Sequence, residues 1–221
     1  HPTRAYSIIY AVHQFLADKG VVGLLVNYRG GIGYGQEFRQ AIAGAQGHKV
    51  AADVFAAGRY LGSLDHVDEE AIGVWGLSYG GYATLRLLGT HTDTFDLGVS
   101  IAGVADRRTY ADWTTRVKRP EPEFRLPTLF GGSRWDAPDA WAAESPITTV
   151  EKYEAPLYTF HGTADADVHV EQQDLLVNAL LQTDAEFEAE YYPGEGHVFR
   201  SAAVWARTIE KIYGAIESEL R

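Results

Sequence analysis

The sequence has 221 residues, 46% of them hydrophobic, which is enough to bury the core of one domain. Its 30 acidic and 19 basic residues give a formal net charge of −11, which argues against a nucleic-acid partner and against an anionic membrane face. It has no cysteine, which excludes disulfides and thiolate chemistry. No apolar run approaches the roughly 20 residues of a membrane span, so we expect a soluble chain. The compartment stays open, with the cytoplasm favoured.

Short apolar and β-branched runs predict buried strands, over residues 21–28, 71–77, 97–104 and 156–161. Near-continuous hydrophobicity is typical of parallel strands that are covered on both faces. A later run, over residues 187–192, alternates apolar and polar residues, as a half-exposed edge strand does.

Helical patterns separate these strands. Apolar residues recur at helical spacing from Val50 to Leu64 and again from Trp205 to Leu220. Alternating strands and helices imply right-handed crossovers, so the sequence predicts an α/β fold with a parallel sheet. Residues 107–145 contain four prolines, and we expect an insertion of short helices and loops there. Such loops, at the carboxyl ends of parallel strands, bind ligands.

The stretch Gly76-Leu77-Ser78-Tyr79-Gly80 matches G-x-S-x-G, with a predicted strand before it and a helical stretch after it. Such a turn holds its serine in a strained backbone conformation, and we expect Gly76 and Gly80 to let the strand and the helix approach closely. The helix also directs the positive end of its dipole at the site. We therefore predict Ser78 to be a nucleophile rather than only a small residue in a tight turn.

A serine nucleophile needs an acid and a base, which in this fold follow it in that order. Asp165 lies in the turn directly after the predicted strand 156–161 and is the preferred acid. Asp167 is its rival, although we expect Asp167 to begin the next helix. His197 lies in a glycine-flexible loop after the last strand and is the predicted base, because His169 is too close to Asp165 to bridge an acid and a serine.

The backbone N–H of Tyr79, directly after the nucleophile, is the first candidate oxyanion donor. The second donor normally comes from a loop after an earlier strand, and the sequence starts near such a loop, at His1. Tyr110 and Trp113 follow the strand 97–104 and either line a hydrophobic substrate pocket or pack beneath the insertion.

No cofactor or metal is predicted. The glycine-rich stretch Arg29–Gly35 lacks the Lys-Ser/Thr pair of a phosphate-binding P-loop, and no acidic residue follows it at the spacing of a dinucleotide site. The histidines form no H-E-x-x-H pair, so we expect no metal centre.

Four stretches together, residues 27–41, 73–85, 145–172 and 191–199, resemble the C-terminal hydrolase domain of the prolyl oligopeptidase family of serine peptidases, which includes dipeptidyl peptidases and acylaminoacyl peptidases. The resemblance implies an α/β-hydrolase fold, with helices on both faces of a mostly parallel sheet. It implies the same nucleophile, acid, base and oxyanion donor as the motifs do. It also implies that Val168 touches the pocket for the residue before the scissile bond.

The sequence departs from this family in three places. The tryptophan of a G-x-W-G pattern is absent before the helix that contains Asp53, and only His1 and Pro2 match the oxyanion loop. The β-propeller that the family places before the hydrolase, and the first strands of the hydrolase sheet, have no counterpart. We therefore expect residues 1–221 to be the catalytic domain of a longer polypeptide, with the propeller portion as its partner. Self-association stays open.

These observations predict a serine peptidase that hydrolyses short peptides through an acyl-enzyme. A carboxylesterase or lipase is the alternative, because the same triad serves both reactions. A domain kept only for assembly is the third, and it would have a disrupted triad, which the sequence does not show.

Overall fold

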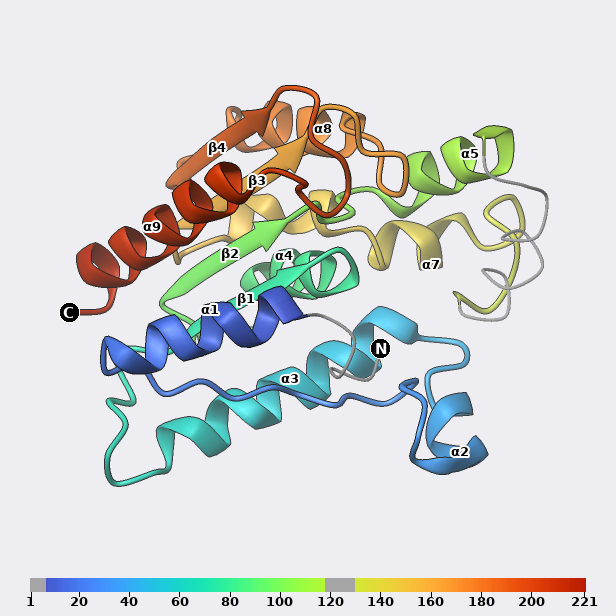
Figure 1. Cartoon of the computed structure of the whole chain (residues 1–221). Coiled ribbons are helices and arrows are strands. Elements are labelled where there is room, and N and C mark those ends of the chain that lie inside the picture. Colours follow the sequence, from blue (N-terminus) through green and yellow to red (C-terminus); the bar gives the residue numbers. More distant parts are fainter. Residues whose placement is uncertain (1–6, 118–129) are drawn as a thin grey trace.

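The structure is a computed structural model that describes residues 7–117 and 130–221 (Figure 1). Its centre is a sheet in the order β1-β2-β3-β4, in which each neighbouring pair is parallel. The strands are β1 (Gly73–Leu77), β2 (Leu97–Ile101), β3 (Leu157–Gly162) and β4 (Phe187–Tyr192). The predictions of strands over 71–77, 97–104, 156–161 and 187–192 are therefore confirmed, and β4 lies at one edge, as its alternating pattern indicates.

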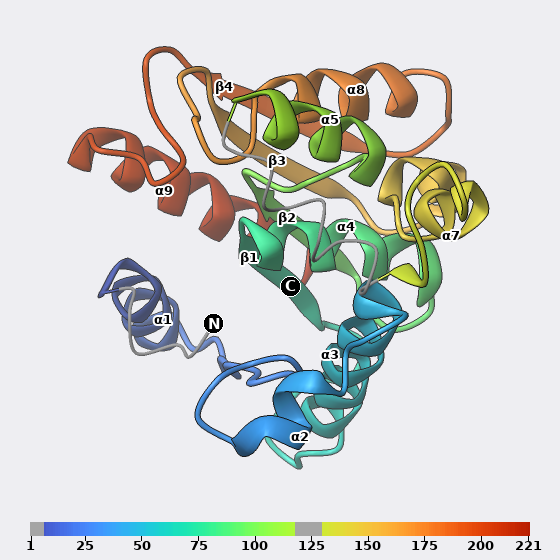
Figure 2. The same ribbon diagram turned by 90° about the vertical axis from the view of Figure 1, so that its right-hand side faces the viewer.

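Helices cover both faces of the sheet (Figures 1 and 2). On one face, α3 (Gln46–Gly62), α4 (Tyr79–Thr90), α8 (Glu171–Leu180) and the 3-10 helix η2 (Pro146–Lys152) bury their apolar side chains. On the other face, α1 (Ser7–Asp18) and α9 (Ala202–Glu219) do the same. The short helix α2 (Gly35–Gln40) buries none of its residues.

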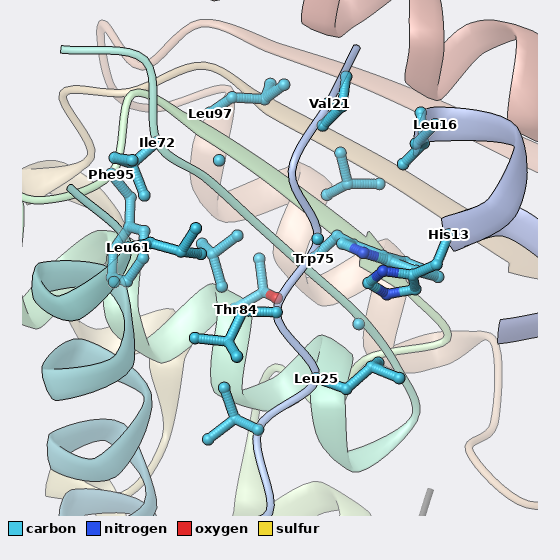
Figure 3. Close-up of a pocket in the computed structure, with 18 of the residues that line it drawn as sticks. His13, Leu16, Val21, Leu25, Leu61, Ile72, Trp75, Thr84, Phe95 and Leu97 are labelled. Carbon is cyan, nitrogen blue, oxygen red and sulfur yellow. The ribbon is translucent and has the colours of Figure 1, made fainter. Parts of the chain in front are cut away.

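The predicted strand over Val21–Tyr28 is wrong. This segment is irregular, and residues 22–27 make no backbone–backbone hydrogen bond with any described residue. An apolar cavity of about 470 Å³ separates the segment from the free edge of β1. Figure 3 shows Val21 and Leu25 at this cavity, together with Trp75 of β1. A strand forms only when a neighbouring strand completes its ladder of hydrogen bonds, and no strand within residues 7–117 and 130–221 pairs with this segment.

The predicted insertion after β2 is confirmed in the part of it that the structure describes. It contains the short helices α5 (Arg107–Val117) and α7 (Pro138–Ala143). Within residues 7–117 and 130–221, no helix is long and apolar enough to cross a bilayer.

Glu144, directly after α7, ties the insertion to the sheet-covering helices. Its carboxylate accepts hydrogen bonds from the Gly47 N–H at 2.6 Å and from the Tyr82 hydroxyl at 3.0 Å, and it lies 3.8 Å from the Arg86 guanidinium. Gly47 lies in the first turn of α3, where backbone N–H groups have no partner within the helix. Glu144 therefore caps α3 and holds α4 and α7 beside it.

Candidate active site

Ser78 lies at the sharp turn between β1 and α4. Its φ of 61° and ψ of −115° are strained for a residue with a side chain. Two hydrogen bonds fix this conformation: the Ser78 N–H donates to the carbonyl of Ile101 at 2.8 Å, and the Tyr82 N–H donates to the carbonyl of Ser78 at 2.9 Å. The strain at Ser78 is thus maintained by β2 on one side and by the first turn of α4 on the other.

Only one of the two motif glycines is required by close packing. A Cβ on Gly76 would lie 2.6 Å from the Cα of Gly80, so a larger residue at position 76 would push the strand and the helix apart. A Cβ on Gly80 itself would meet open space, so the expectation for Gly80 is wrong. Gly81 makes the close approach instead, because a Cβ there would lie 2.8 Å from the carbonyl oxygen of Ile101.

The structure pairs Asp165 with His197. The Nδ1 atom of His197 lies 2.7 Å from Oδ2 of Asp165, whose side chain is fully buried. The other carboxylate oxygen, Oδ1, accepts the backbone N–H groups of Asp167 at 2.7 Å and of Val168 at 2.9 Å. Burial acts to raise the pKa of Asp165, but the hydrogen bonds from His161, His197 and Val168 outweigh it and hold that pKa well below its ordinary value. Asp165 is therefore an anion that orients the imidazole of His197.

His161, at the end of β3, is a site residue that the sequence reasoning missed. It is buried, and its Nε2 atom lies 2.8 Å from the carbonyl of Val168 and 3.4 Å from Oδ2 of Asp165. Because a carbonyl oxygen can only accept, Nε2 carries the proton, which it also presents to the carboxylate. The sequence contained one signal for this role, a histidine near the end of a predicted buried strand and four residues before the predicted acid.

Asp167 does not begin the next helix as expected. Helix α8 starts at Glu171, and turns occupy the residues between β3 and this helix. The side chain of Asp167 is exposed, and its backbone N–H serves Asp165.

Side-chain ligand atoms of Asp165, Asp167 and His197 lie within 4.8 Å of one another. A metal ion at this place would have to displace the 2.7 Å hydrogen bond between Asp165 and His197. The Asp165 carboxylate is therefore already engaged by the His197 ring and by two backbone N–H groups.

The loop that carries His197 is packed against the end of β3. The Ala164 N–H donates to the carbonyl of Glu195 at 2.8 Å, and the Gly194 N–H donates to Oγ1 of Thr163 at 2.9 Å. A Cβ on Gly162 would overlap the carbonyl of Glu195. This contact fixes how close the His197 loop lies to the strand that leads to Asp165.

Ser78 and His197 line the same cavity, the one that separates β1 from residues 21–28. Both residues lie in the described ranges, and no hydrogen bond joins them. Their elements bring them to one place because β1, β3 and β4 are parallel and end at the same edge of the sheet.

Tyr79 is the first residue of α4, where backbone N–H groups have no acceptor within the helix. Its ring packs between those of Tyr28, at 5.7 Å, and Tyr82, at 5.2 Å. Burial raises the pKa of Tyr79 well above its ordinary value, and it raises the pKa of Tyr28 to about 12, so both hydroxyls are protonated at neutral pH. The other end of the predicted oxyanion hole, at His1, lies outside the described residues.

Two of the three predicted substrate-pocket residues come together. Val168 is buried and packs with Tyr82 and Val104, and Tyr79 and Tyr110 lie against them. Trp113 lies instead beside the ring of His169, at 5.6 Å. We call the group formed by Val168, Tyr82, Val104, Tyr79 and Tyr110 the tyrosine cluster.

The model of the prolyl oligopeptidase family matches residues 7–219. Dipeptidyl aminopeptidase BIII of Pseudoxanthomonas mexicana is 30% identical over 193 residues, covering 85% of this chain and 27% of that protein. Dipeptidyl peptidase 4 of Bos taurus is 30% identical over 176 residues, covering 78% of this chain and 21% of that protein. The chain thus spans about a quarter of the length of these relatives.

Solved structures share the fold. A puromycin-hydrolyzing peptidase of Mycobacterium tuberculosis superposes with a TM-score of 0.81 at 25% identity, covering 88% of this chain and 29% of that one. Dipeptidyl peptidase 4 of Porphyromonas gingivalis does so with a TM-score of 0.78 at 28% identity, covering 91% of this chain and 28% of that one. The predicted α/β-hydrolase fold is confirmed.

Proposed function

Because the chain belongs to the prolyl oligopeptidase family, we propose that it is the catalytic part of a serine peptidase that hydrolyses short peptides. The observation that carries this proposal is the buried Asp165–His197 pair, joined at 2.7 Å, on the same cavity as the strained Ser78. A serine hydroxyl is a poor nucleophile unless such a base takes its proton.

In the proposed mechanism, Nε2 of His197 takes the proton of Ser78 as Oγ forms a bond to the substrate carbonyl carbon. Asp165 accepts the Nδ1–H of His197 and stabilises the imidazolium that results. The Tyr79 N–H donates to the oxyanion of the tetrahedral intermediate. His197 then gives its proton to the leaving amine, the C–N bond breaks, and an acyl-enzyme remains on Ser78. Water then attacks the acyl carbon as His197 takes its proton, the bond to Oγ of Ser78 breaks, and His197 returns the proton to Oγ as the product acid leaves.

We also propose that the chain is the C-terminal portion of a longer polypeptide, whose N-terminal part contains a propeller and the remaining strands of the sheet. The cavity of about 470 Å³ supports this proposal, because the edge of β1 and the segment 22–27 border it with backbone groups that pair with no strand in the described part of the chain. A strand inserted there would satisfy both sides. The loop after that strand would supply the second oxyanion donor.

The triad is tested with a fluorophosphonate, which reacts covalently with an activated serine. We expect labelling at Ser78, located by mass spectrometry, and its loss in His197→Ala.

In Ser78→Ala, hydrolysis of a peptide anilide falls by about 10⁶-fold, because removing a member of a triad removes the whole nucleophilic step. The control is Ser63→Ala, at the exposed end of α3, which leaves both readouts unchanged. Unchanged turnover in Ser78→Ala would refute the mechanism.

A short-chain ester separates the peptidase from an esterase of the same fold. A peptidase cleaves the anilide as well as the ester, whereas an esterase leaves the anilide intact. The assays use both the 221-residue chain and the longer polypeptide, because the second oxyanion donor belongs to the proposed missing part. The loss of one such donor costs about 3 kcal/mol of transition-state stabilisation.

A further inference from the structure

Arg107, the first residue of α5, is a buried cation without a carboxylate partner among the described residues. It is 5% exposed, and its Nε and Nη2 atoms make no hydrogen bond with any residue in the described ranges. Asp106, its neighbour in sequence, pairs with Arg108 at 3.3 Å. Glu144 is engaged by the first turn of α3, by Tyr82 and by Arg86.

Aromatic rings surround the guanidinium. Its Cζ atom lies 3.7 Å from the centre of the Tyr82 ring and 5.4 Å from that of Tyr79. Burial acts to lower the pKa of Arg107, but the oxygens of Tyr82, Tyr79 and Tyr110 outweigh it, so the residue keeps its charge. Ring faces attract a cation, but they leave the Nε–H and Nη2–H donors of Arg107 without a partner among the described residues.

The hydroxyl of Tyr79 is a second unsatisfied donor in the same cluster. It is buried and has no hydrogen-bond partner in the described part of the chain. Buried polar groups are nearly always hydrogen-bonded, and each exception needs an explanation. Here the unsatisfied donors of a cation and of a protonated phenol occur together, which is the environment that an anionic acceptor fits.

This place adjoins the proposed catalytic residues on two sides. Tyr79 follows Ser78 directly and lines both the cavity that contains Ser78 and the tyrosine cluster. Val168 belongs to the same cluster and donates its backbone N–H to Asp165. The Tyr79 ring thus borders the cavity of Ser78 and also lies 5.4 Å from the Cζ atom of Arg107.

We propose that Arg107 selects substrates with an acidic side chain, Glu or Asp, before the scissile bond. The inference rests on the proposed peptidase function. The planar guanidinium donates Nε–H and Nη2–H to the two oxygens of one carboxylate, and the Tyr79 hydroxyl donates to it as well. The Tyr79 ring turns aside to admit the carboxylate.

The test uses peptide anilides that differ only in the residue before the anilide, Glu in one and Gln in the other. Because Gln has the shape of Glu without its charge, their ratio of kcat/KM isolates the carboxylate. We expect the wild-type protein to prefer Glu by about 10- to 100-fold, the range for hydrogen bonds to a charged group. Arg107→Gln abolishes the preference by lowering kcat/KM for the Glu substrate to the level of the Gln substrate, while Arg107→Lys retains part of the preference.

The control is Arg108→Gln. Arg108 is the exposed neighbour of Arg107, and its loss leaves the preference for Glu unchanged. Binding of the Glu peptide to Ser78→Ala, with and without Arg107→Gln, gives a second readout that needs no turnover.

Two failures are distinguishable. If the fluorophosphonate labels Ser78 and the Gln substrate is cleaved, but the wild type shows no preference for Glu or Arg107→Gln keeps it, then Arg107 has only a structural role. If Ser78 is not labelled and no anilide is cleaved, the peptidase function fails and this inference fails with it.

Discussion

At the scale of single residues, the carboxylate of Asp165 shows how a buried charge is made stable. Both oxygens receive donors, from two backbone N–H groups on one side and from His197 on the other, and His161 lies 3.4 Å from the second oxygen. A buried carboxylate without such donors would be protonated rather than charged. We therefore propose that His161 is a positioning residue, which holds the carboxylate of the proposed acid, Asp165, against His197.

This arrangement predicts how stability depends on pH. Because the pKa of Asp165 is lower in the folded chain than in the unfolded one, its contribution to stability is fully present above about pH 4 and is lost as the pH falls below that value. We expect the free energy of unfolding of the wild type, measured with urea between about pH 2.5 and pH 7, to fall more steeply in acid than that of Asp165→Asn. Asp184→Asn, at an exposed carboxylate in the loop before β4, serves as the control and keeps the wild-type slope. Equal slopes for the wild type and Asp165→Asn would contradict the assignment.

At the scale of elements, the turn between β1 and α4 is defined by how closely two backbones meet. Gly76 of β1 meets Gly80 of α4, and Gly81 of α4 meets the end of β2 at Ile101. These contacts hold α4 against two strands at once and impose the strained conformation of Ser78. The same principle fixes the loop of His197, which Gly162 allows to lie against the end of β3.

Alanine substitutions at Gly76 and Gly80 test whether a glycine of the G-x-S-x-G motif is needed for close packing or only belongs to the motif. We expect Gly76→Ala to lower the free energy of unfolding by about 1–3 kcal/mol or more, because its Cβ has no space. Gly80→Ala leaves that free energy unchanged or raises it by up to about 1 kcal/mol, because its Cβ meets open space and alanine favours the helix. Urea denaturation of the two variants measures the difference. Equal destabilisation by both would show that the contact at Gly76 does not matter.

At the scale of the whole molecule, β1 has a neighbouring strand on only one of its two sides among the described residues. β2, β3 and β4 follow β1 in order, while the other edge of β1 faces the cavity and the segment 21–28 (Figure 3). That segment exposes Val22 and Leu24, which a paired strand in a covered sheet would bury.

Hydrogen exchange tests whether a strand fills this cavity in the longer polypeptide. We expect the amides of residues 22–27 to exchange rapidly in the 221-residue chain and to be protected when the preceding part is present, because ladder hydrogen bonds slow exchange. The amides of β2 and β3, which have strands on both sides, are the internal control and stay protected in both forms. Unchanged exchange at residues 22–27 would rule out a strand in the cavity.

Local pattern alone determined much of this protein. Apolar runs at 71–77, 97–104 and 156–161 predicted β1, β2 and β3, because such runs are typical of strands that a parallel sheet buries on both faces. The order of Ser78, Asp165 and His197, with the motif around the serine, likewise named the residues that we propose as the triad. Motifs carry such information because each describes one short stretch of backbone.

Only the tertiary structure decided what depends on distant neighbours. Residues 21–28 have the composition of a strand but form none, because a strand needs a partner and the neighbouring edge lies across a cavity. The burial of Arg107 depends on rings from α4, and the support of Asp165 by His161 depends on the turn after β3. Hydrogen bonds, burial and unsatisfied charge are properties of pairs that folding brings together, so no stretch read by itself contains them.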